Sequence, residues 1–410
     1  MDAHDNEKDN GAPEVNHNIN SEEFAKEDEN IPKENEPIQD ETEITENDLK
    51  SAEDEMIEDL SLENIEELKD DSVEGFFGHS DSVYCVRFNP INQSMVVSGG
   101  GDEVGFLWNC EDGETPLAKL EGHSDSVSSC SYSFDGKYIA TGSMDSTIRI
   151  FEGSSGVFIH SLEGPSSDIE WIKWHPKGPV LLVGCADGTC WMFNAVNAEC
   201  LHVFSGHRGS VTCGGFNSSG KYAITCSEDA SCYIWNAKTG QAKHQLKGGN
   251  YFHSEQINCM DCHSSKALLL TGSHDKTARL THIKSGKNLL SVKIHESPIE
   301  GVAFSNSEQS WFSVCSIDGL ISIWDTNLGH CRSRFSVKDG IIRMMWHPTQ
   351  PFIICSGLDG QMLLVDGRSG KVEKLWHGHV GSILDFDLSR DGNTIVTAGN
   401  DSSCLVFKLN

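Results

Sequence analysis

The chain has 410 residues, of which 62 are acidic and 31 basic, so its formal net charge is −31 at pH 7. This acidity disfavours direct binding to the phosphates of DNA or RNA and favours basic partners. No apolar run approaches the 18 residues of a membrane span and no apolar N-terminal signal is evident, so we expect no membrane insertion, reduced cysteines and a cytoplasmic protein, with the nucleus as a second compartment.

The first 71 residues differ in composition from the rest of the chain. Residues 1–70 hold 26 Asp and Glu against 5 Lys, a net charge of −21, and Phe24 is their only aromatic residue. Such a segment cannot offset its loss of chain entropy, which predicts a disordered acidic tail over 1–71. Residues 52–69 carry apolar side chains at partly helical spacing, so a partner-docking helix is an alternative to the solvated linker that we favour there. The rest of the chain keeps a net charge of −10.

From residue 72 onward the sequence repeats with a period of 41 to 46 residues. One column holds aspartates, a second and mostly aromatic column follows six residues later, and a third, mostly histidine, precedes the aspartate by 22 or 23 residues. The first column is Asp102, Asp145, Asp187, Asp229, Asp275, Asp318, Asp359 and Asp401. The third column is His79, His123, His207, His253, His295 and His379, with Pro165 and Val337 in the other two repeats. A period of this length with Gly-His early and Trp-Asp late resembles the WD-repeat family, whose repeats are the blades of a propeller.

Each repeat contains four short runs of alternating hydrophobicity separated by turn residues. In the first repeat these runs are 82–88, 95–98, 104–108 and 117–120. One such sheet cannot bury both of its faces, so neighbouring sheets must pack face to face. The sequence thus predicts an all-β, eight-bladed propeller over 72–410. Because the last repeat stops after its third strand, we expect 72–77 to supply the outer strand of the last blade and to close the ring.

The resemblance implies a structural role for the polar columns. In WD repeats the histidine, a hydroxyl, the aspartate and the tryptophan form one hydrogen-bonded chain, which satisfies buried polar groups. In the first repeat these residues are His79, Ser98, Asp102 and Trp108, and in the fourth they are His207, Thr225, Asp229 and Trp235. Repeats three, six and seven carry Val183, Val314 and Cys355 at the hydroxyl position, so we expect incomplete networks and more reliance on apolar packing in those blades.

Acidic residues recur where each repeat enters its first strand. These turns should gather around one mouth of the ring, where they would form an electronegative funnel for a Lys/Arg-rich peptide. The candidate partner-binding residues are Asp81, Asp125, Asp168, Glu170, Glu228, Glu255, Glu296, Glu300 and Asp339, and Arg208 and Arg343 interrupt the pattern. A merely soluble surface is the competing interpretation.

Two motifs that suggest chemistry have simpler explanations. The stretch from Cys259 to His263 matches the C-x-x-C-H pattern of haem attachment, but both cysteines fall in the inner strand of the fifth repeat. The Ser, His and Asp of each repeat superficially match a hydrolase triad, but scaffolding repeats around a ring whereas one active site does not. We therefore expect no catalytic residues, no metal and no cofactor, and a non-enzymatic protein.

The third repeat narrows the resemblance. Its strings 168–176 and 179–188, together with 383–391 in the last repeat, are similar to angio-associated migratory cell protein, as is the acidic tail ahead of eight repeats. In that family, fungal members are dedicated chaperones of a basic large-subunit ribosomal protein, and animal members are linked to cell migration and angiogenesis. The charge favours the first role. We expect a monomer that binds a newly made, basic ribosomal protein for ribosome assembly. A signalling scaffold is the alternative, and a ubiquitin-ligase substrate receptor is a weaker one.

Overall fold

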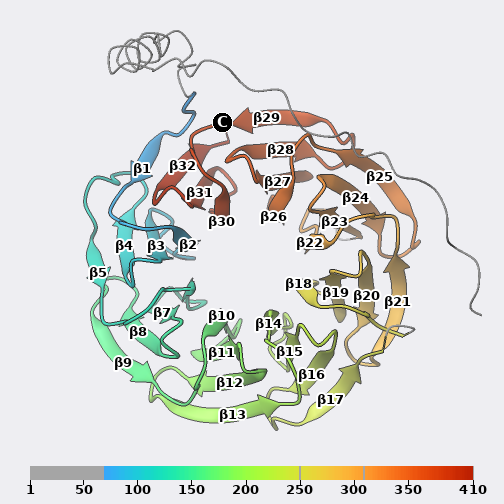
Figure 1. The fold of residues 1–410 in the computed structure, drawn as a ribbon, viewed down its shortest axis with the longest axis horizontal. Coiled ribbons are helices and arrows are strands. Elements are labelled where there is room, and N and C mark those ends of the chain that lie inside the picture. Colours follow the sequence, from blue (N-terminus) through green and yellow to red (C-terminus); the bar gives the residue numbers. More distant parts are fainter. Residues whose placement is uncertain (1–68, 249–250, 308–309, 410) are drawn as a thin grey trace, which may run out of the picture. The chain divides into compact units, whose positions relative to one another are not determined.

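The structure, a computed structural model, describes residues 69–248, 251–307 and 310–409. In these ranges 32 strands form eight four-stranded antiparallel sheets, arranged as the blades of a propeller around a central opening (Figure 1). They contain no helix long and apolar enough to cross a membrane. Nearly all of the predicted tail, 1–71, and of the 52–69 segment lies outside the described residues. The prediction of an all-β, eight-bladed propeller is confirmed.

Blades one to four each contain four consecutive strands, ordered from the channel outward. Blade one consists of β2 (Val83–Phe88), β3 (Met95–Gly100), β4 (Gly105–Asn109) and β5 (Ala118–Leu120). Blade two consists of β6 (Ser129–Tyr132), β7 (Tyr138–Gly142), β8 (Ile148–Glu152) and β9 (Phe158–Leu162). Blade three consists of β10 (Ile169–Trp174), β11 (Val180–Cys185), β12 (Thr189–Asn194) and β13 (Glu199–Ser205). Blade four consists of β14 (Cys213–Phe216), β15 (Tyr222–Cys226), β16 (Cys232–Asn236) and β17 (Ala242–Leu246).

Blades five to seven follow the same order, and blade eight takes its outer strand from the other end of the chain. Blade five consists of β18 (Ile257–Cys262), β19 (Leu268–Ser273), β20 (Ala278–His282) and β21 (Lys287–Val292). Blade six consists of β22 (Ile299–Phe304), β23 (Trp311–Ser316), β24 (Leu320–Asp325) and β25 (Cys331–Ser336). Blade seven consists of β26 (Ile341–Trp346), β27 (Phe352–Gly357), β28 (Met362–Asp366) and β29 (Val372–Trp376). Blade eight consists of β30 (Ile383–Leu388), β31 (Thr394–Gly399), β32 (Cys404–Lys408) and β1 (Glu74–Phe76).

Burial along the strands follows their position in a blade. The second strand of each blade lies between two other strands of its sheet, and the neighbouring blades cover its two faces. For this reason β3, β19 and β31 are buried at every residue. Outer strands such as β13 and β25 alternate or are mostly exposed, which matches their polar composition. Adjacent blades pack through shared apolar clusters, as where Ile148 and Leu162 of blade two meet Leu181 and Phe193 of blade three. The ring therefore buries both faces of every sheet.

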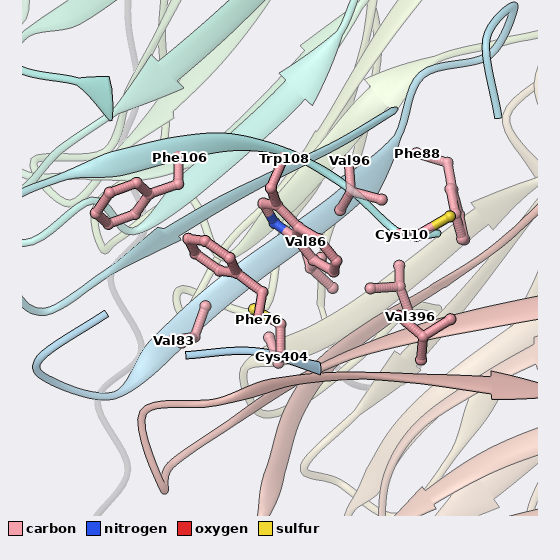
Figure 2. Packing of buried hydrophobic residues seen from close by; sticks show 12 residues of the cluster. Phe76, Val83, Val86, Phe88, Val96, Phe106, Trp108, Cys110, Val396 and Cys404 are labelled. Atoms are coloured by element: carbon pink, nitrogen blue, oxygen red, sulfur yellow. The ribbon is translucent and has the colours of Figure 1, made fainter. Parts of the chain in front are cut away.

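The ring is closed by β1, which pairs antiparallel with β32, Phe76 opposite Cys404. The side chain of Phe76 is 1% exposed and packs into blade one, where its ring stacks on Trp108 with centroids 5.2 Å apart and an interplanar angle of 9° (Figure 2). Val396 and Cys404 of blade eight lie in the same cluster. Just before β1, Asp71 accepts a hydrogen bond from the His377 backbone N–H at 3.0 Å. The two ends of the described chain are thus joined in one sheet. The outer strand β1 lies within 72–77, the segment that was expected to supply it.

Candidate functional site

One face of the ring carries two sets of loops. In each four-stranded meander the connection from the second to the third strand and the link to the next blade lie at the same end of the sheet. The column histidines and aspartates stand in these two sets of loops, and we call this surface the His–Asp face. The opposite face carries the connections from first to second and from third to fourth strand.

Hydrogen-bonded chains of His, hydroxyl, Asp and Trp hold these loops in blades one and four. In blade one, His79 Nδ1 lies 3.0 Å from the Asp102 carboxylate, His79 Nε2 lies 2.9 Å from Ser98 Oγ, and Trp108 Nε1 donates to Ser98 Oγ at 3.2 Å. In blade four, Trp235 Nε1 donates to Thr225 Oγ1 at 2.9 Å and His207 Nε2 lies 2.8 Å from the same oxygen. His207 Nδ1 is 3.4 Å from Asp229 and 2.9 Å from Ser231 Oγ. All eight residues assigned to the two networks therefore meet.

Blades two, five and eight contain the His, hydroxyl and Asp part of this chain without the Trp, and the pKa of each of their column aspartates is lowered. Asp145 shows the balance of effects. Burial alone would raise the pKa of Asp145, but hydrogen bonds from the Thr147 side chain and the Ser124 backbone outweigh it and lower that pKa to about 2. Burial lowers the pKa of the partner His123, and the Asp145 charge offsets only part of this effect. In these three blades the loops of the His–Asp face are therefore held by ionised aspartates.

The three blades without the column hydroxyl behave differently from one another. The expectation of an incomplete network is wrong for blade six, because Ser322 on β24 replaces the hydroxyl missing at Val314. His295 Nε2 lies 2.8 Å from Ser322 Oγ, and Trp324 Nε1 donates to the same oxygen at 3.0 Å. In blade three Pro165 stands at the histidine column, and Trp191 Nε1 donates to Thr189 Oγ1 at 3.0 Å instead.

In blade seven the aspartate of the first column lies beside a second carboxylate. Val337 stands where six of the other blades have histidine, and the pKa of Asp359 is raised, first by burial and then by the charge of Asp339. The structure thus brings one of the nine acidic candidates, Asp339, close to Asp359, a residue that the sequence interpretation treated as purely structural.

All nine acidic candidates lie on the His–Asp face. Six lie in the links between blades, Glu170 and Glu300 are the second residues of inner strands β10 and β22, and Glu228 precedes Asp229. Eight of the nine side chains are exposed; Glu300 is half-buried. Its Oε1 accepts a hydrogen bond from Asn258 Nδ2 at 3.0 Å, and burial raises its pKa.

The two basic residues that interrupt the acidic pattern have different surroundings. Arg208 is exposed at the rim, where its backbone N–H donates to Asp229 Oδ2 at 2.9 Å. Arg343 lies on β26 inside the channel and is bonded to Asp385 on β30, which also binds Arg87 on β2. This ion cluster was missed in the sequence, because Arg87 is 298 residues from Asp385 and meets it only when the ring closes.

The channel contains a cavity of about 520 Å³ lined by residues of inner strands, among them Lys173, Asp261, Glu300, Ile342, Arg343 and Leu384. Carboxylates on the inner strands bond to the free edge of the next blade. Asp261 Oδ2 accepts from the Phe304 N–H at 2.7 Å, and Asp387 Oδ2 from the Phe88 N–H at 2.9 Å. Burial raises the pKa of Asp261 to about 6 and lowers that of Lys173 to about 8. These charges therefore serve contacts within the ring.

The cysteine motif of the fifth repeat lies in β18. Cys259 and Cys262 are free thiols, and burial raises the pKa of each well above its usual range. Across the described ranges no group of three or more His, Cys, Asp or Glu side chains is placed to hold a metal ion.

Comparisons with known proteins place the chain in a family. The sequence pattern of the WD domain, G-beta repeat, matches residues 71–109, 114–152, 156–194, 198–236, 246–281, 286–325 and 370–408. The segment 326–369, which contains Val337 and Cys355, lies between the last two matches. Seven of the eight repeats thus carry a recognisable pattern.

Among solved structures, Sqt1 from Chaetomium thermophilum has a TM-score of 0.78 and 22% identity, covering 84% of this chain and all of that one. The same protein bound to the N-terminus of the ribosomal protein L10 has a TM-score of 0.76 and 22% identity, covering 83% and 100%. At this identity the likeness establishes the fold.

Relatives identified by sequence are more similar. Angio-associated migratory cell protein of Homo sapiens is 31% identical over 352 residues, which cover 82% of this chain and 80% of that protein. An uncharacterised WD repeat-containing protein of Schizosaccharomyces pombe is 30% identical over 350 residues, covering 82% and 86%. The chain therefore belongs to the WD-repeat family and, within it, to the group of angio-associated migratory cell protein.

Proposed function

We propose that the His–Asp face binds a basic segment of a newly made large-subunit ribosomal protein, and that the protein is a dedicated chaperone for that client in ribosome assembly. In this proposal the protein acts as a cytoplasmic monomer, without catalysis and without direct contact to nucleic acid. The observation that carries the proposal is the position of the nine acidic side chains on one face, eight of them exposed.

Charge supports this assignment. A basic ribosomal protein that is not yet assembled is attracted to nucleic acid and prone to aggregation, and an acidic surface would shield it. Opposite charges also steer the encounter and raise the association rate, an effect that salt screens. The ring keeps a net charge of −10 without its first 70 residues, so the attraction does not depend on the tail.

The comparisons support a ribosomal protein as the client. Sqt1 shares the fold and has been crystallised with the N-terminus of the ribosomal protein L10. Ribosome assembly protein SQT1 of Saccharomyces cerevisiae is also related in sequence, with 30% identity over 105 residues, a quarter of this chain. The human relative's name points to cell migration, which keeps a signalling scaffold as the rival function.

The partner is identified by purifying the tagged protein from its own cells, with and without ribonuclease, and by mass spectrometry. We expect one basic large-subunit ribosomal protein in near-equal amount, resistant to ribonuclease. Signalling or cytoskeletal proteins in its place would favour the scaffold.

The surface is tested by charge reversal. We expect the variant Asp125→Lys, Glu170→Lys, Glu255→Lys to bind a synthetic Lys/Arg-rich peptide at least about tenfold more weakly than wild type. The matched control is Glu111→Lys, Glu114→Lys, Glu199→Lys, which changes the net charge equally on exposed residues of the opposite face. Equal binding by the two variants would refute this surface.

A further inference from the structure

Among the acidic residues of the His–Asp face, blades six to eight carry exposed aliphatic side chains in neighbouring loops. Ile317, between β23 and β24, is 44% exposed, and Leu358, between β27 and β28, is 47% exposed. Val380, in the link that enters β30, is 75% exposed. We call these three residues, together with Ile342 and Leu384, the apolar sector.

The loops of the apolar sector are in direct contact. The Leu358 N–H donates to Gly340 O at 3.0 Å, and a Cβ built on Gly340 would lie 2.6 Å from the Leu358 side chain and 2.4 Å from the Ile317 carbonyl oxygen. Ser382 Oγ, two residues after Val380, donates to Leu358 O at 2.8 Å. Loops of three successive blades therefore form one continuous surface.

The apolar sector extends into the channel mouth. Ile342 and Leu384 are the second residues of β26 and β30, and both line the cavity that Glu300 also lines. Glu300 and Glu170 occupy the same position in β22 and β10. Because β22, β26 and β30 succeed one another around the opening (Figure 1), equivalent side chains change from acidic to aliphatic between blades six and seven.

Carboxylates border the apolar sector. Asp339 precedes Gly340 and Asp359 follows Leu358 in two loops joined by the Leu358 N–H to Gly340 O bond, and the Asp339 charge helps to raise the pKa of Asp359. Two neighbouring carboxylates favour a cation, and the adjacent leucine favours an apolar group. A second copy of this acidic ring, or the acidic tail, would be repelled here, so charge complementarity selects a basic partner.

We propose that the His–Asp face recognises an extended segment of mixed chemistry, in which Lys or Arg residues alternate with aliphatic residues that lie on the apolar sector. This inference rests on the proposed function and specifies its client. The acidic residues would attract many basic chains alike, whereas burial of the apolar sector adds affinity that salt does not screen. The apolar contact would therefore select one basic protein among many.

The test uses two synthetic peptides of equal length and charge. One alternates arginine and leucine, and in the other serine replaces every leucine. Binding is measured by calorimetry at low and at physiological salt. We expect the wild-type protein to bind the leucine peptide at least about tenfold more tightly than the serine peptide at low salt. Most of this difference in affinity should remain at physiological salt.

The variant Ile317→Ser, Leu358→Ser should lose this preference while binding the serine peptide as wild type does. Its control is Leu328→Ser, a residue that is 71% exposed in the β24–β25 connection on the opposite face. Melting temperatures of all variants confirm that the ring is intact.

Each outcome decides between the two proposals. Equal binding of both peptides by the wild type overturns the apolar sector and leaves the capture of basic segments standing. Failure to bind either peptide overturns the proposed function itself. If Ile317→Ser, Leu358→Ser weakens the binding of both peptides equally, the inference is also overturned, because the two residues would then make no specific contact with the leucine side chains of the peptide.

Discussion

At the scale of single residues, the position after each column aspartate has the same backbone conformation in all eight blades. Its φ is positive everywhere, from 62° at Ala230 to 81° at Gly188. Only Gly188, Gly319 and Gly360 are glycines there, and the other five repeats place an L-residue in the left-handed region, at a cost of roughly 1–2 kcal/mol each. The tight turn into the third strand requires this conformation, so the strain is repeated around the ring.

We expect Ala230→Gly to raise the free energy of unfolding by about 0.5–1 kcal/mol, because relief of the left-handed strain exceeds the added entropy of the unfolded chain. Urea denaturation measures the change. The reverse substitution is the control: Gly319→Ala should destabilise by more than about 1 kcal/mol, since its Cβ would also lie 2.7 Å from the carbonyl oxygens of Val337 and Asp339. A loss of stability in Ala230→Gly would contradict the argument.

The buried histidines make stability depend on pH. Burial lowers the pKa of His295 from 6.5 to about 4, and the Asp318 charge offsets only part of the effect. Between these values the unfolded chain binds the proton and the folded ring does not, so stability falls as pH falls, by up to about 1.4 kcal/mol per pH unit for this residue.

Urea midpoints of wild type and His295→Gln, measured from pH 7 to pH 4, test this assignment. The variant should be less stable at pH 7, because the contacts to Ser316 and Ser322 are lost, but its stability should change less with pH. Parallel curves for the two proteins would show that His295 does not titrate in this window.

At the scale of elements, single aromatic side chains on one blade pack into the neighbouring blade. The three residues of β1 are bonded to blade eight, yet Phe76 fills a cavity of blade one against Trp108 and Phe106 (Figure 2). Trp171 on β10 similarly crosses to blade four, where its Nε1 donates to Val211 O at 2.7 Å. A Cβ on Gly214 would lie 2.2 Å from its ring, so the space for the indole exists only because that residue is glycine.

The closure of the ring by β1 predicts different effects for two adjacent phenylalanines. Phe76→Ala should lower the free energy of unfolding by about 3–5 kcal/mol, since Phe76 is 1% exposed and its removal leaves a cavity. Phe77, which is 73% exposed, is the matched control, and Phe77→Ala should change stability by less than about 0.5 kcal/mol. Thermal and urea unfolding compare the two variants. Similar stability of both would mean that β1 does not hold the ring closed.

At the scale of the whole molecule, the sequence predicts what depends on one repeat and fails where distant repeats meet. The period predicts the blades. The turns predict that Asp125 and Glu255 share a face, because a given position of the repeat lies on the same face in every blade. Ser322 was missed because it lies outside the hydroxyl column but reaches the same histidine. The apolar sector and the Arg87–Asp385–Arg343 cluster depend on which unlike residues become neighbours around the ring, and no single repeat contains that information.

That buried cluster links blades seven, eight and one, and it yields a prediction about the ring as a unit. Asp385 is 3% exposed, bonds Arg87 and Arg343, and accepts the Val86 N–H at 3.2 Å. Asp385→Ala leaves two guanidinium groups without their carboxylate and should lower the free energy of unfolding by about 3–5 kcal/mol. Asp125→Ala, an exposed aspartate, should change it by less than about 0.5 kcal/mol.

Replacing the whole cluster separates charge from packing. If the loss arises from unpaired charges, the variant Arg87→Met, Arg343→Met, Asp385→Leu should recover most of it, because apolar side chains of similar volume need no partner. If it arises from the Val86 N–H, which loses its acceptor in both variants, the triple variant should remain as unstable as Asp385→Ala. Urea denaturation of the three proteins distinguishes these causes. Recovery would mean that the ion cluster adds no net stability to the closed ring beyond what apolar side chains of similar volume provide.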